Sequence, residues 1–225
     1  KNPHKKNEAI PNRNIKCNLK AYQFANFISV ASQHVKESFL LHQYPENRIF
    51  VNPYGVDLSM FKPLPNIPKK YDVIMVGGWG YEKGCDLIVE AIRKTNYSFI
   101  HVGSIKDVDF PQEKNFTHID PVDQSKLIEY YNQAKVFILP SRQDGFGMVL
   151  SQALACNLPI IGSNNCGAPD LKKMVELPEY ITIIKDYTAD AIVTAIHTAI
   201  KNYEQLGERI YAGNAIENLT WEAYG

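Results

Sequence analysis

Residues 135–162 read KVFILPSRQDGFGMVLSQALACNLPIIG, and this stretch decides the fold class. It begins with the apolar run 135–139, which is typical of a buried strand, and it ends with a second such run at 159–162. Between them, a helical pattern at 146–156 follows a loop that contains glycine. A strand, a helix and a second strand joined in this way form a βαβ unit, in which the two strands run parallel.

The same alternation covers residues 71–203. Further strand-like runs lie at 72–77, 98–102, 116–119 and 181–184, and further helical patterns lie at 84–94, 123–134 and 188–203. Apolar strands that alternate with helices predict an α/β fold, here a doubly wound, Rossmann-like parallel sheet of six strands with helices on both faces. With the common strand order 3-2-1-4-5-6, a ligand binds beyond the carboxyl ends of the first and fourth strands.

Residues 1–52 predict the remnant of a second Rossmann-like domain. Strand-like runs lie at 27–31 and 48–51, each preceded by a helical pattern, and two strands alone cannot bury a sheet. Because the chain begins with Lys1 rather than Met, we expect it to be a piece of a longer protein. Residues 1–20 are basic and rich in asparagine, and they predict a loop or linker.

The composition excludes several classes of protein. The 24 Lys and Arg residues balance 24 Asp and Glu residues, which argues against nucleic acid as a partner, and 45% apolar residues argue against disorder. No apolar run approaches the roughly 20 residues of a membrane span, so we expect a soluble protein. The four cysteines form no CxxC pair and have no histidine at metal-ligand spacing, which favours free, buried thiols and a cytoplasmic location.

The loop after the first strand of the six-stranded sheet, residues 76–84, reads VGGWGYEKG and leads into a helix. Glycines let the backbone approach a ligand, a helix N-terminus offers free N–H groups, and Lys83 adds a positive charge, so the loop predicts a phosphate site. It is neither a P-loop nor a clean GxGxxG fingerprint. The second strand ends at 99–104 without the acid that a dinucleotide site needs, which disfavours a dehydrogenase.

The loop after the fourth strand, residues 139–152, again runs from a strand end through glycines into a helix. Asp144 in this loop either caps the helix or contacts a ligand. Because both loops lie where the strand order reverses, we expect one lysine, one carboxylate and two helix N-termini to meet in one crevice. A ligand with phosphate groups and hydroxyls, such as a nucleotide sugar, fits this combination.

Four segments also resemble those of a known family. Residues 140–162 closely resemble the carboxylate-x7-carboxylate segment of the retaining nucleotide-sugar glycosyltransferases of family 4 (group 1), which have the GT-B fold of two Rossmann-like domains. Residues 76–84 are similar to that family's Gly-Arg…Lys-Gly donor loop, and residues 51–63 to its inter-domain hinge. Residues 219–222 are similar to the start of its C-terminal helix.

The resemblance implies that the chain divides into four parts. Residues 1–52 would be the C-terminal remnant of the N-terminal, acceptor-binding domain, and residues 53–70 the inter-domain linker. Residues 71–203 would be the domain that binds the nucleotide-sugar donor. Residues 204–225 would be a helical tail that packs towards the N-terminal domain.

The resemblance also implies roles for individual residues. Lys83 would bind the donor diphosphate and Asp144 the hydroxyls of the transferred sugar, which makes these two the catalytic candidates. The other donor-binding candidates are Gly78, Trp79, Gly145, Phe146, Gly147, Met148, Val149 and Gln152. No metal is expected and no cofactor either, because the nucleoside diphosphate sugar is the substrate.

Three of these positions depart from the family's pattern. Gly78 stands at the position of the family's phosphate-binding arginine, Asp144 is one methylene shorter than the usual Glu, and Gln152 replaces a second Glu that holds the ribose. Arg142 either compensates for the lost charge or is a solvated surface residue. Trp79 either stacks on the ligand or packs beside the glycine turn.

Other polar residues have structural interpretations in the sequence. His101 lies near the carboxyl end of an apolar strand, which favours a buried, hydrogen-bonded histidine over a contact near the nucleotide. Asp107 and Asp109 are interpreted as part of a solvated loop, and Cys85 as an inert thiol despite its place at a helix N-terminus.

The implied function is transfer of a sugar from a nucleoside diphosphate sugar to an acceptor hydroxyl with retention at the anomeric carbon. The acceptor would be a glycan, a glycolipid or another glycoconjugate, with peripheral membrane contact through the basic residues 1–20 as one option. The alternative is a non-catalytic domain that binds a nucleotide or a nucleotide sugar. The base, the sugar and the oligomeric state stay open.

Overall fold

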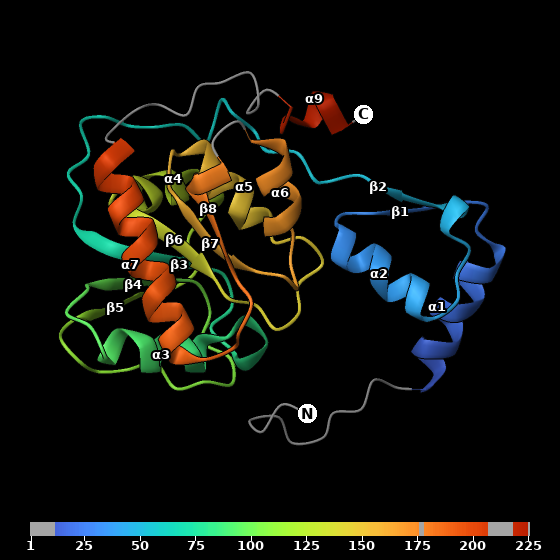
Figure 1. Cartoon of the computed structure of the whole chain (residues 1–225), viewed down its shortest axis with the longest axis horizontal. Helices are drawn as coiled ribbons and strands as arrows, with labels where there is room; N and C mark the ends of the chain where they lie inside the picture. The colour runs from blue at the N-terminus through green and yellow to red at the C-terminus, as the bar shows by residue number, and fades with distance from the viewer. Residues whose placement is uncertain (1–11, 176–177, 207–217, 225) are drawn as a thin grey trace.

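The computed structural model describes residues 12–175, 178–206 and 218–224. Its main feature is a parallel sheet of six strands in the order β5-β4-β3-β6-β7-β8 (Figure 1). The strands are β3 (Tyr71–Val76), β4 (Phe99–Val102), β5 (Phe116–Ile119), β6 (Ala134–Leu139), β7 (Ile160–Ser163) and β8 (Ile181–Ile184). This is the predicted order 3-2-1-4-5-6, so both the α/β class and the position of the reversal, between β3 and β6, are confirmed.

Helices cover the sheet and connect consecutive strands, except β4 and β5, which a loop without a helix joins. They are α3 (Cys85–Arg93), α4 (Gln124–Asn132), α5 (Met148–Ala155), α6 (Ala168–Met174) and α7 (Ala189–Leu206), with short 3-10 helices η2 (Tyr81–Lys83) and η3 (Pro178–Tyr180). Helices α3 and α7 pack against each other in front of the sheet in Figure 1, and α4 and α5 lie behind it. Because parallel strands need right-handed crossovers, helices on both faces follow from this strand order.

The short helix α6 was not predicted from the sequence. It has seven residues, and Pro169 stands in its first turn. A proline there is favourable, since its ring fixes a helical φ and the missing N–H has no intrahelical partner. The same proline makes the segment resemble a loop when only the sequence is considered.

The centre of the sheet forms the hydrophobic core. The side chains of Val73, Ile74 and Met75 in β3 are fully buried. Val73 is paired with Phe99 of β4 on one side and with Val136 of β6 on the other. Apolar residues on both faces of the strands are expected for a sheet that helices cover twice.

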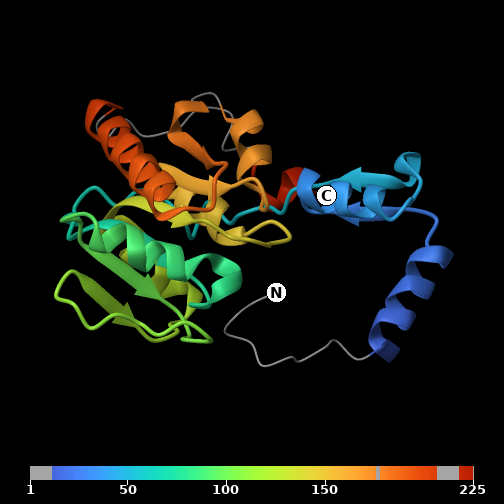
Figure 2. The same ribbon diagram turned by 60° about the horizontal axis from the view of Figure 1, so that its bottom comes forward.

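The N-terminal part contains α1 (Asn12–Phe24), β1 (Ile28–Val30), α2 (Gln33–Leu41), η1 (Glu46–Arg48) and β2 (Ile49–Val51). Strands β1 and β2 pair in parallel and form a separate two-stranded sheet, which lies beside the six-stranded unit in both views (Figures 1 and 2). Large apolar side chains remain exposed here, namely Phe24, Phe27, Leu41 and Phe50. This part therefore does not complete a core among the described residues.

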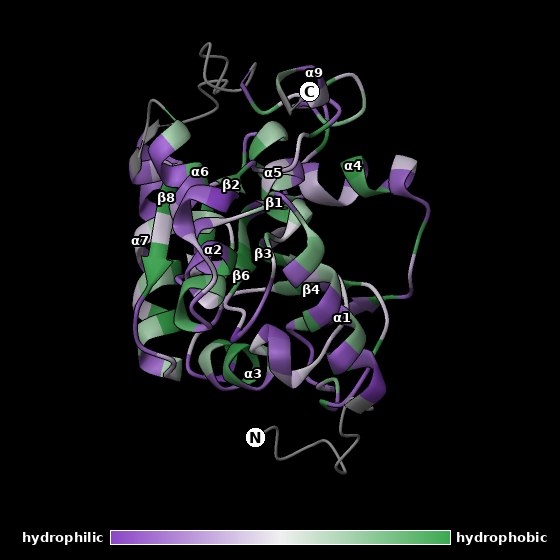
Figure 3. Cartoon of the chain, turned by 90° about the vertical axis from the view of Figure 1, so that its right-hand side faces the viewer, coloured by the Kyte–Doolittle hydropathy of each residue, from purple (hydrophilic) through white to green (hydrophobic). Residues whose placement is uncertain are grey.

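The prediction of a loop over residues 1–20 is wrong for residues 12–20, which belong to α1; residues 1–11 lie outside the described residues. Helix α1 is largely hydrophilic, as its colouring in Figure 3 shows. Its apolar residues Ile15, Leu19 and Tyr22 nevertheless recur at helical spacing, and the Tyr22 ring lies 5.0 Å from the Phe39 ring of α2. The many basic residues obscured this pattern.

The N-terminal part and the C-terminal residues both contact the main unit and its linker. The Ser32 hydroxyl donates to the Gly145 carbonyl at 2.6 Å, and the Gln33 amide donates to the Asp170 carboxylate at 3.1 Å. Helix α9 (Trp221–Tyr224) lies beside the linker, where the Val56 amide donates to Leu219 O at 2.6 Å. Of the predicted C-terminal tail, residues 207–217 and 225 lie outside the described residues.

Candidate functional site

The two predicted loops meet at the carboxyl ends of β3 and β6. The Arg142 amide of the second loop donates to the Glu82 carbonyl of the first at 2.8 Å. Gly84 has φ +73°, and a β-carbon added there would lie 2.4 Å from the Pro140 carbonyl oxygen. Only glycine therefore allows the loops to approach this closely without a shift in the backbone.

Lys83 and Asp144 form an ion pair between the two loops, through Nζ and Oδ2. Their side chains are 28% and 15% exposed, so the pair is partly buried but still reached by solvent. The Asp144 backbone is fixed by its amide, which donates to Asn165 O at 2.9 Å. The structure thus brings together the two residues that the sequence predicted as catalytic candidates.

Helix α5 begins at this pair. Gly147 precedes it with φ +79°, and no side chain caps the helix, so Asp144 is not its N-cap. The first bonded amide of the helix is that of Leu150, which donates to Gly147 O. In the part of the chain that the structure describes, the amides of Gly147, Met148 and Val149 have no protein acceptor. Free amides at a helix N-terminus form an anion site, as predicted for this loop.

At the N-terminus of α3, several of the amides that were predicted to be free are engaged. A turn of 3-10 helix, η2, precedes α3, and it uses the amides that were expected to be free. Those of Lys83 and Cys85 donate to Gly80 O at 3.0 and 3.3 Å, and that of Gly84 donates to Tyr81 O at 3.0 Å. These three amides are therefore engaged within the protein, and the side chain that the first loop brings to the site is that of Lys83.

Trp79 does not present its ring to a ligand. Its side chain is fully buried, with ring centroids 5.6 Å from Phe99, 5.0 Å from His101 and 5.0 Å from Phe110. Of the two predicted alternatives, packing beside the glycine turn is the one observed. Its backbone amide donates to Ser104 O, so neither the ring nor this amide supports Trp79 as a donor-binding candidate.

Gln152 also points into the protein. It is 6% exposed, and its amide oxygen accepts a hydrogen bond from the buried Tyr131 hydroxyl at 2.9 Å. Burial raises the pKa of Tyr131 well above its usual value, so this hydroxyl remains a donor. The expectation that the Gln152 oxygen holds a ribose is therefore not supported by its position.

Phe146 is buried as well, and its ring lies 5.8 Å from that of Tyr54 in the linker. Its amide donates to Asp144 Oδ1 at 3.3 Å, which leaves it unavailable to a ligand in this arrangement. Gly145 is exposed at the tip of the loop, and its carbonyl accepts from Ser32. The loop thus contacts both the linker and the N-terminal part.

Arg142 is neither solvated nor free to replace a missing charge. Its guanidinium makes two hydrogen bonds to the Asp86 carboxylate, at 2.6 and 2.8 Å, and lies 3.8 Å from the centroid of the Tyr81 ring. In this arrangement, the pair with Asp86 supports neither of the two alternatives considered for Arg142. Its charge is balanced within the protein, and it ties the second loop to α3.

His101 is fully buried, as favoured by the sequence. Its Nε2 lies 2.8 Å from Gly77 O, and because a carbonyl only accepts, this nitrogen carries the proton. Its Nδ1 then accepts from His118 Nδ1 at 3.0 Å. Burial lowers the pKa of His101 to about 4, so it is neutral at neutral pH and holds the carbonyl of the glycine loop.

The contribution of the loop after β4 was not predicted from the sequence. Asp107 was interpreted as solvated, but its Oδ1 accepts from the Tyr81 amide at 2.8 Å. The side chain of Lys106, in the same loop, lies against Gly78. The signal that could have identified these residues is topological, since this loop also leaves the carboxyl edge of the sheet beside β3.

The prediction of free, buried thiols is confirmed for three of the four cysteines and is wrong on burial for Cys17. Cys17 is exposed, the other three are buried, and all four are free thiols. Burial raises the pKa of Cys85 to about 12, which makes it inert as expected.

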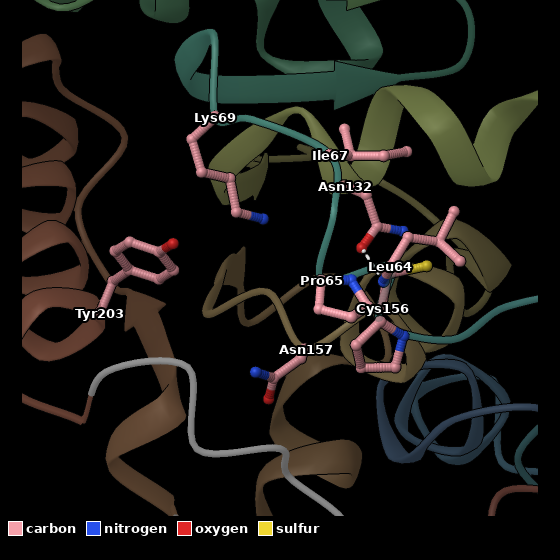
Figure 4. A pocket seen from close by; sticks show the side chains of 9 residues that line it. Leu64, Pro65, Ile67, Lys69, Asn132, Cys156, Asn157 and Tyr203 are labelled. Carbon is pink, nitrogen blue, oxygen red and sulfur yellow. Dashed lines mark hydrogen bonds between the residues drawn. The ribbon is translucent and has the colours of Figure 1, made fainter.

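A separate pocket lies at the opposite edge of the sheet, near the amino ends of β3 and β7 (Figure 4). Figure 4 shows Lys69 of the linker and Tyr203 of α7 facing each other across it, with the Lys69 ammonium 5.8 Å from the centroid of the ring. None of the candidate site residues lines it.

Neither a cluster of metal-ligating side chains nor a helix fit to span a membrane occurs among the described residues. They contain no group of three or more His, Cys, Asp or Glu side chains placed to hold a metal ion. None of their helices combines the length and the apolar character that a membrane span requires.

A family model described as glycosyl transferases group 1 matches residues 58–215. A probable sucrose-phosphate synthase from Thermosipho melanesiensis is 25% identical over 90% of this chain and 53% of its own length. A GDP-mannose-dependent alpha-(1-6)-phosphatidylinositol monomannoside mannosyltransferase from Mycolicibacterium smegmatis is 23% identical over 89% of this chain and 60% of its own. The chain thus spans little more than half of these two relatives.

Among solved structures, Anabaena HepE in complex with UDP and glucose is similar over 96% of this chain and 65% of its own, with a TM-score of 0.76 and 16% identity. At this identity the likeness concerns the fold. It agrees with the Rossmann-like unit described above and with the GT-B architecture.

Proposed function

The chain belongs to the group 1 glycosyl transferases, and we propose that it binds a nucleoside diphosphate sugar and supports transfer of the sugar to an acceptor hydroxyl with retention at the anomeric carbon. The observation that carries this proposal is the Lys83–Asp144 pair at the N-terminus of α5, beside three amides without a protein acceptor. A cation and free amides suit a diphosphate, and a carboxylate suits sugar hydroxyls.

The proposed chemistry follows from where charge develops. The bond between the anomeric carbon and the diphosphate oxygen breaks, and the nucleoside diphosphate leaves with the electron pair. The acceptor oxygen forms the new bond to the anomeric carbon and loses its proton. Lys83 and the amides of Gly147, Met148 and Val149 would stabilise the charge on the leaving diphosphate, which is the largest contribution expected of such a site.

The ion pair gives Asp144 a second role before the donor arrives. Without a ligand, it balances the charge of Lys83 across the two loops. A diphosphate that binds Lys83 would take this partner away, and the carboxylate would then accept from the hydroxyls of the sugar. Lys83 and Asp144 would thus act in sequence on the two halves of the same donor.

The relatives support a nucleotide-sugar donor but differ in which one. The similar HepE structure contains UDP and glucose, and the similar mannosyltransferase is named for GDP-mannose. We therefore propose the class of donor and leave base and sugar to a binding panel. A glycan or glycolipid acceptor, independence of metal ions, a cytoplasmic location and peripheral membrane contact are parts of the same proposal.

A non-catalytic binding domain is the second candidate, and two observations favour it. Gly78 brings no charge, and the Gln152 oxygen is engaged by Tyr131 rather than available to a ribose. Such a domain would still bind a nucleoside diphosphate through Lys83 and α5. Turnover separates the two candidates, because only an enzyme releases free nucleoside diphosphate from its donor.

Calorimetry with UDP, GDP, ADP and their sugars tests the proposal. We expect one series to bind, and Lys83→Ala to weaken it by about 100-fold. Lys201→Ala is the matched control, because Lys201 is an exposed lysine on the later part of α7. No binding of any nucleotide, or equal binding by both variants, contradicts the proposal. Transfer assays with and without EDTA then test turnover and metal independence.

A further inference from the structure

The loop that follows β4 is held by hydrogen bonds beside the glycine-containing loop of the site, residues 76–84. The Trp79 amide donates to Ser104 O at 2.8 Å, and the Lys106 amide donates to Trp79 O at 2.9 Å. Trp79 and Ile105 also form a parallel bridge. These bonds hold the backbone of Lys106 beside the residue that follows Gly78.

The side chain of Lys106 lies against Gly78. A β-carbon added to Gly78 would be 2.4 Å from Lys106 Cε and 2.8 Å from Lys106 Nζ. The lysine therefore occupies the space into which any side chain at position 78 would extend. The missing side chain of Gly78 is what makes room for the ammonium.

The Lys106 ammonium differs from the cations of the two site loops, residues 76–84 and 139–152, because it has no partner in the described part of the chain. Lys83 is paired with Asp144, and Arg142 is paired with Asp86. Lys106 is exposed, and its ammonium has no hydrogen bond or ion pair to any residue in the described ranges 12–175, 178–206 and 218–224. The neighbouring Asp107 carboxylate is turned towards the Tyr81 amide. A cation that is close to a glycine loop and lacks a partner is available to an anionic ligand.

We infer that Lys106 is a second cation of the donor site and binds the diphosphate from the side of Gly78. This inference rests on the proposed function, because it assumes that a nucleoside diphosphate binds at the carboxyl ends of β3 and β6. Lys83 would contact the diphosphate from the end of the same loop and Lys106 from beside its second glycine. The two ammonium groups, one on the loop after β3 and one on the loop after β4, suit a group with two phosphates.

The test compares ligands that differ only in phosphate number. Calorimetry at low salt measures wild-type protein, Lys106→Met and Lys106→Arg with the nucleoside diphosphate that wild-type protein binds best, its monophosphate and its nucleoside. Lys106→Met keeps the length of the side chain and removes the charge. We expect it to bind the diphosphate about 10-fold more weakly and the nucleoside equally well. Lys106→Arg keeps the charge and is expected to stay within a few-fold of wild type.

Lys201→Met is the control for an exposed lysine lost elsewhere, and thermal unfolding checks that each variant is folded. Diphosphate affinity in Lys106→Met equal to that of wild type overturns the inference. If wild-type protein binds no nucleotide at all, the proposed function fails instead. If Lys83→Ala weakens binding and Lys106→Met does not, only the inference fails.

A double variant tests the position of the charge. Gly78→Arg combined with Lys106→Ala moves the cation from the loop after β4 to the loop after β3. The new side chain would extend into the space that the Lys106 side chain fills in wild type. We expect it to bind the diphosphate more tightly than Lys106→Ala alone. A folded double variant without this gain contradicts the claim that the space beside Gly78 faces the diphosphate.

Discussion

Replacing Asp144 by asparagine should strengthen the binding of a free nucleoside diphosphate. In the structure, the Asp144 carboxylate forms an ion pair with the Lys83 ammonium. Both side chains are partly buried, at 15% and 28% exposure. A ligand phosphate that takes Lys83 must break this pair. A hydrogen bond between charged groups contributes about 1.5–3 kcal/mol, so its removal before binding should tighten the diphosphate by about 10-fold or more.

The same variant should lose the contribution of the sugar. An asparagine oxygen accepts a hydroxyl proton more weakly than a carboxylate does, because it carries no charge. The difference in affinity between nucleotide sugar and free nucleoside diphosphate should therefore shrink, and transfer should slow. Calorimetry with both ligands measures these opposite effects in one variant, which simple misfolding cannot produce.

Asp72→Asn is the matched control for Asp144→Asn. Asp72 lies at the amino end of β3 and pairs with Lys135 at 2.7 Å, so this change also removes one negative charge from an ion pair. It should leave nucleotide affinity unchanged. If Asp144→Asn is folded and binds the diphosphate no more tightly than Asp72→Asn does, the competition between Asp144 and the phosphate is refuted.

Three further predictions concern stability and reactivity. Gly84→Ala should lower the free energy of unfolding by about 3 kcal/mol, since it combines a positive φ with the 2.4 Å approach to Pro140 O, whereas Gly145→Ala, which meets nothing within 4 Å, should be nearly neutral in urea unfolding. Because the pKa of His101 falls to about 4 in the folded protein, its neutral form stabilises the protein fully above about pH 6.5, and about 3 kcal/mol should be lost as the pH falls from 6.5 towards 4. The free energy of unfolding of wild type should therefore fall more steeply between pH 6.5 and 4 than that of His101→Gln. An equal dependence on pH in the two proteins would contradict this prediction. Of the four cysteines, only the exposed Cys17 should react with a thiol reagent in the native protein, and rapid labelling of more than one thiol would contradict the buried positions of the others.

The sequence predicted the fold because the relevant signal is local and repeated. Each apolar run such as 135–139 marks one buried strand, and the order of the strands follows from a small set of topologies. The meeting of Lys83 and Asp144 was predictable for the same reason: the reversal of strand order brings these two loops together wherever the side chains point.

The directions of side chains could not be predicted in the same way. Trp79 follows two glycines, and whether its ring faces the ligand or the core depends on Phe110, which lies 31 residues later in the chain and 5.0 Å away in space. Gln152 sits in the second turn of α5, where burial and the Tyr131 hydroxyl decide its direction. Lys106 was missed because its proposed role depends on the absence of a side chain at Gly78.

The central claim is that a nucleoside diphosphate binds between Lys83 and the N-terminus of α5. A crystal structure of the chain with the best-binding nucleoside diphosphate tests it most directly. We predict diphosphate density within hydrogen-bond distance of the Lys83 ammonium and of the amides of Met148 and Val149, with the Lys83–Asp144 pair opened. A diphosphate bound elsewhere, such as the pocket in Figure 4, with that pair intact would contradict the account.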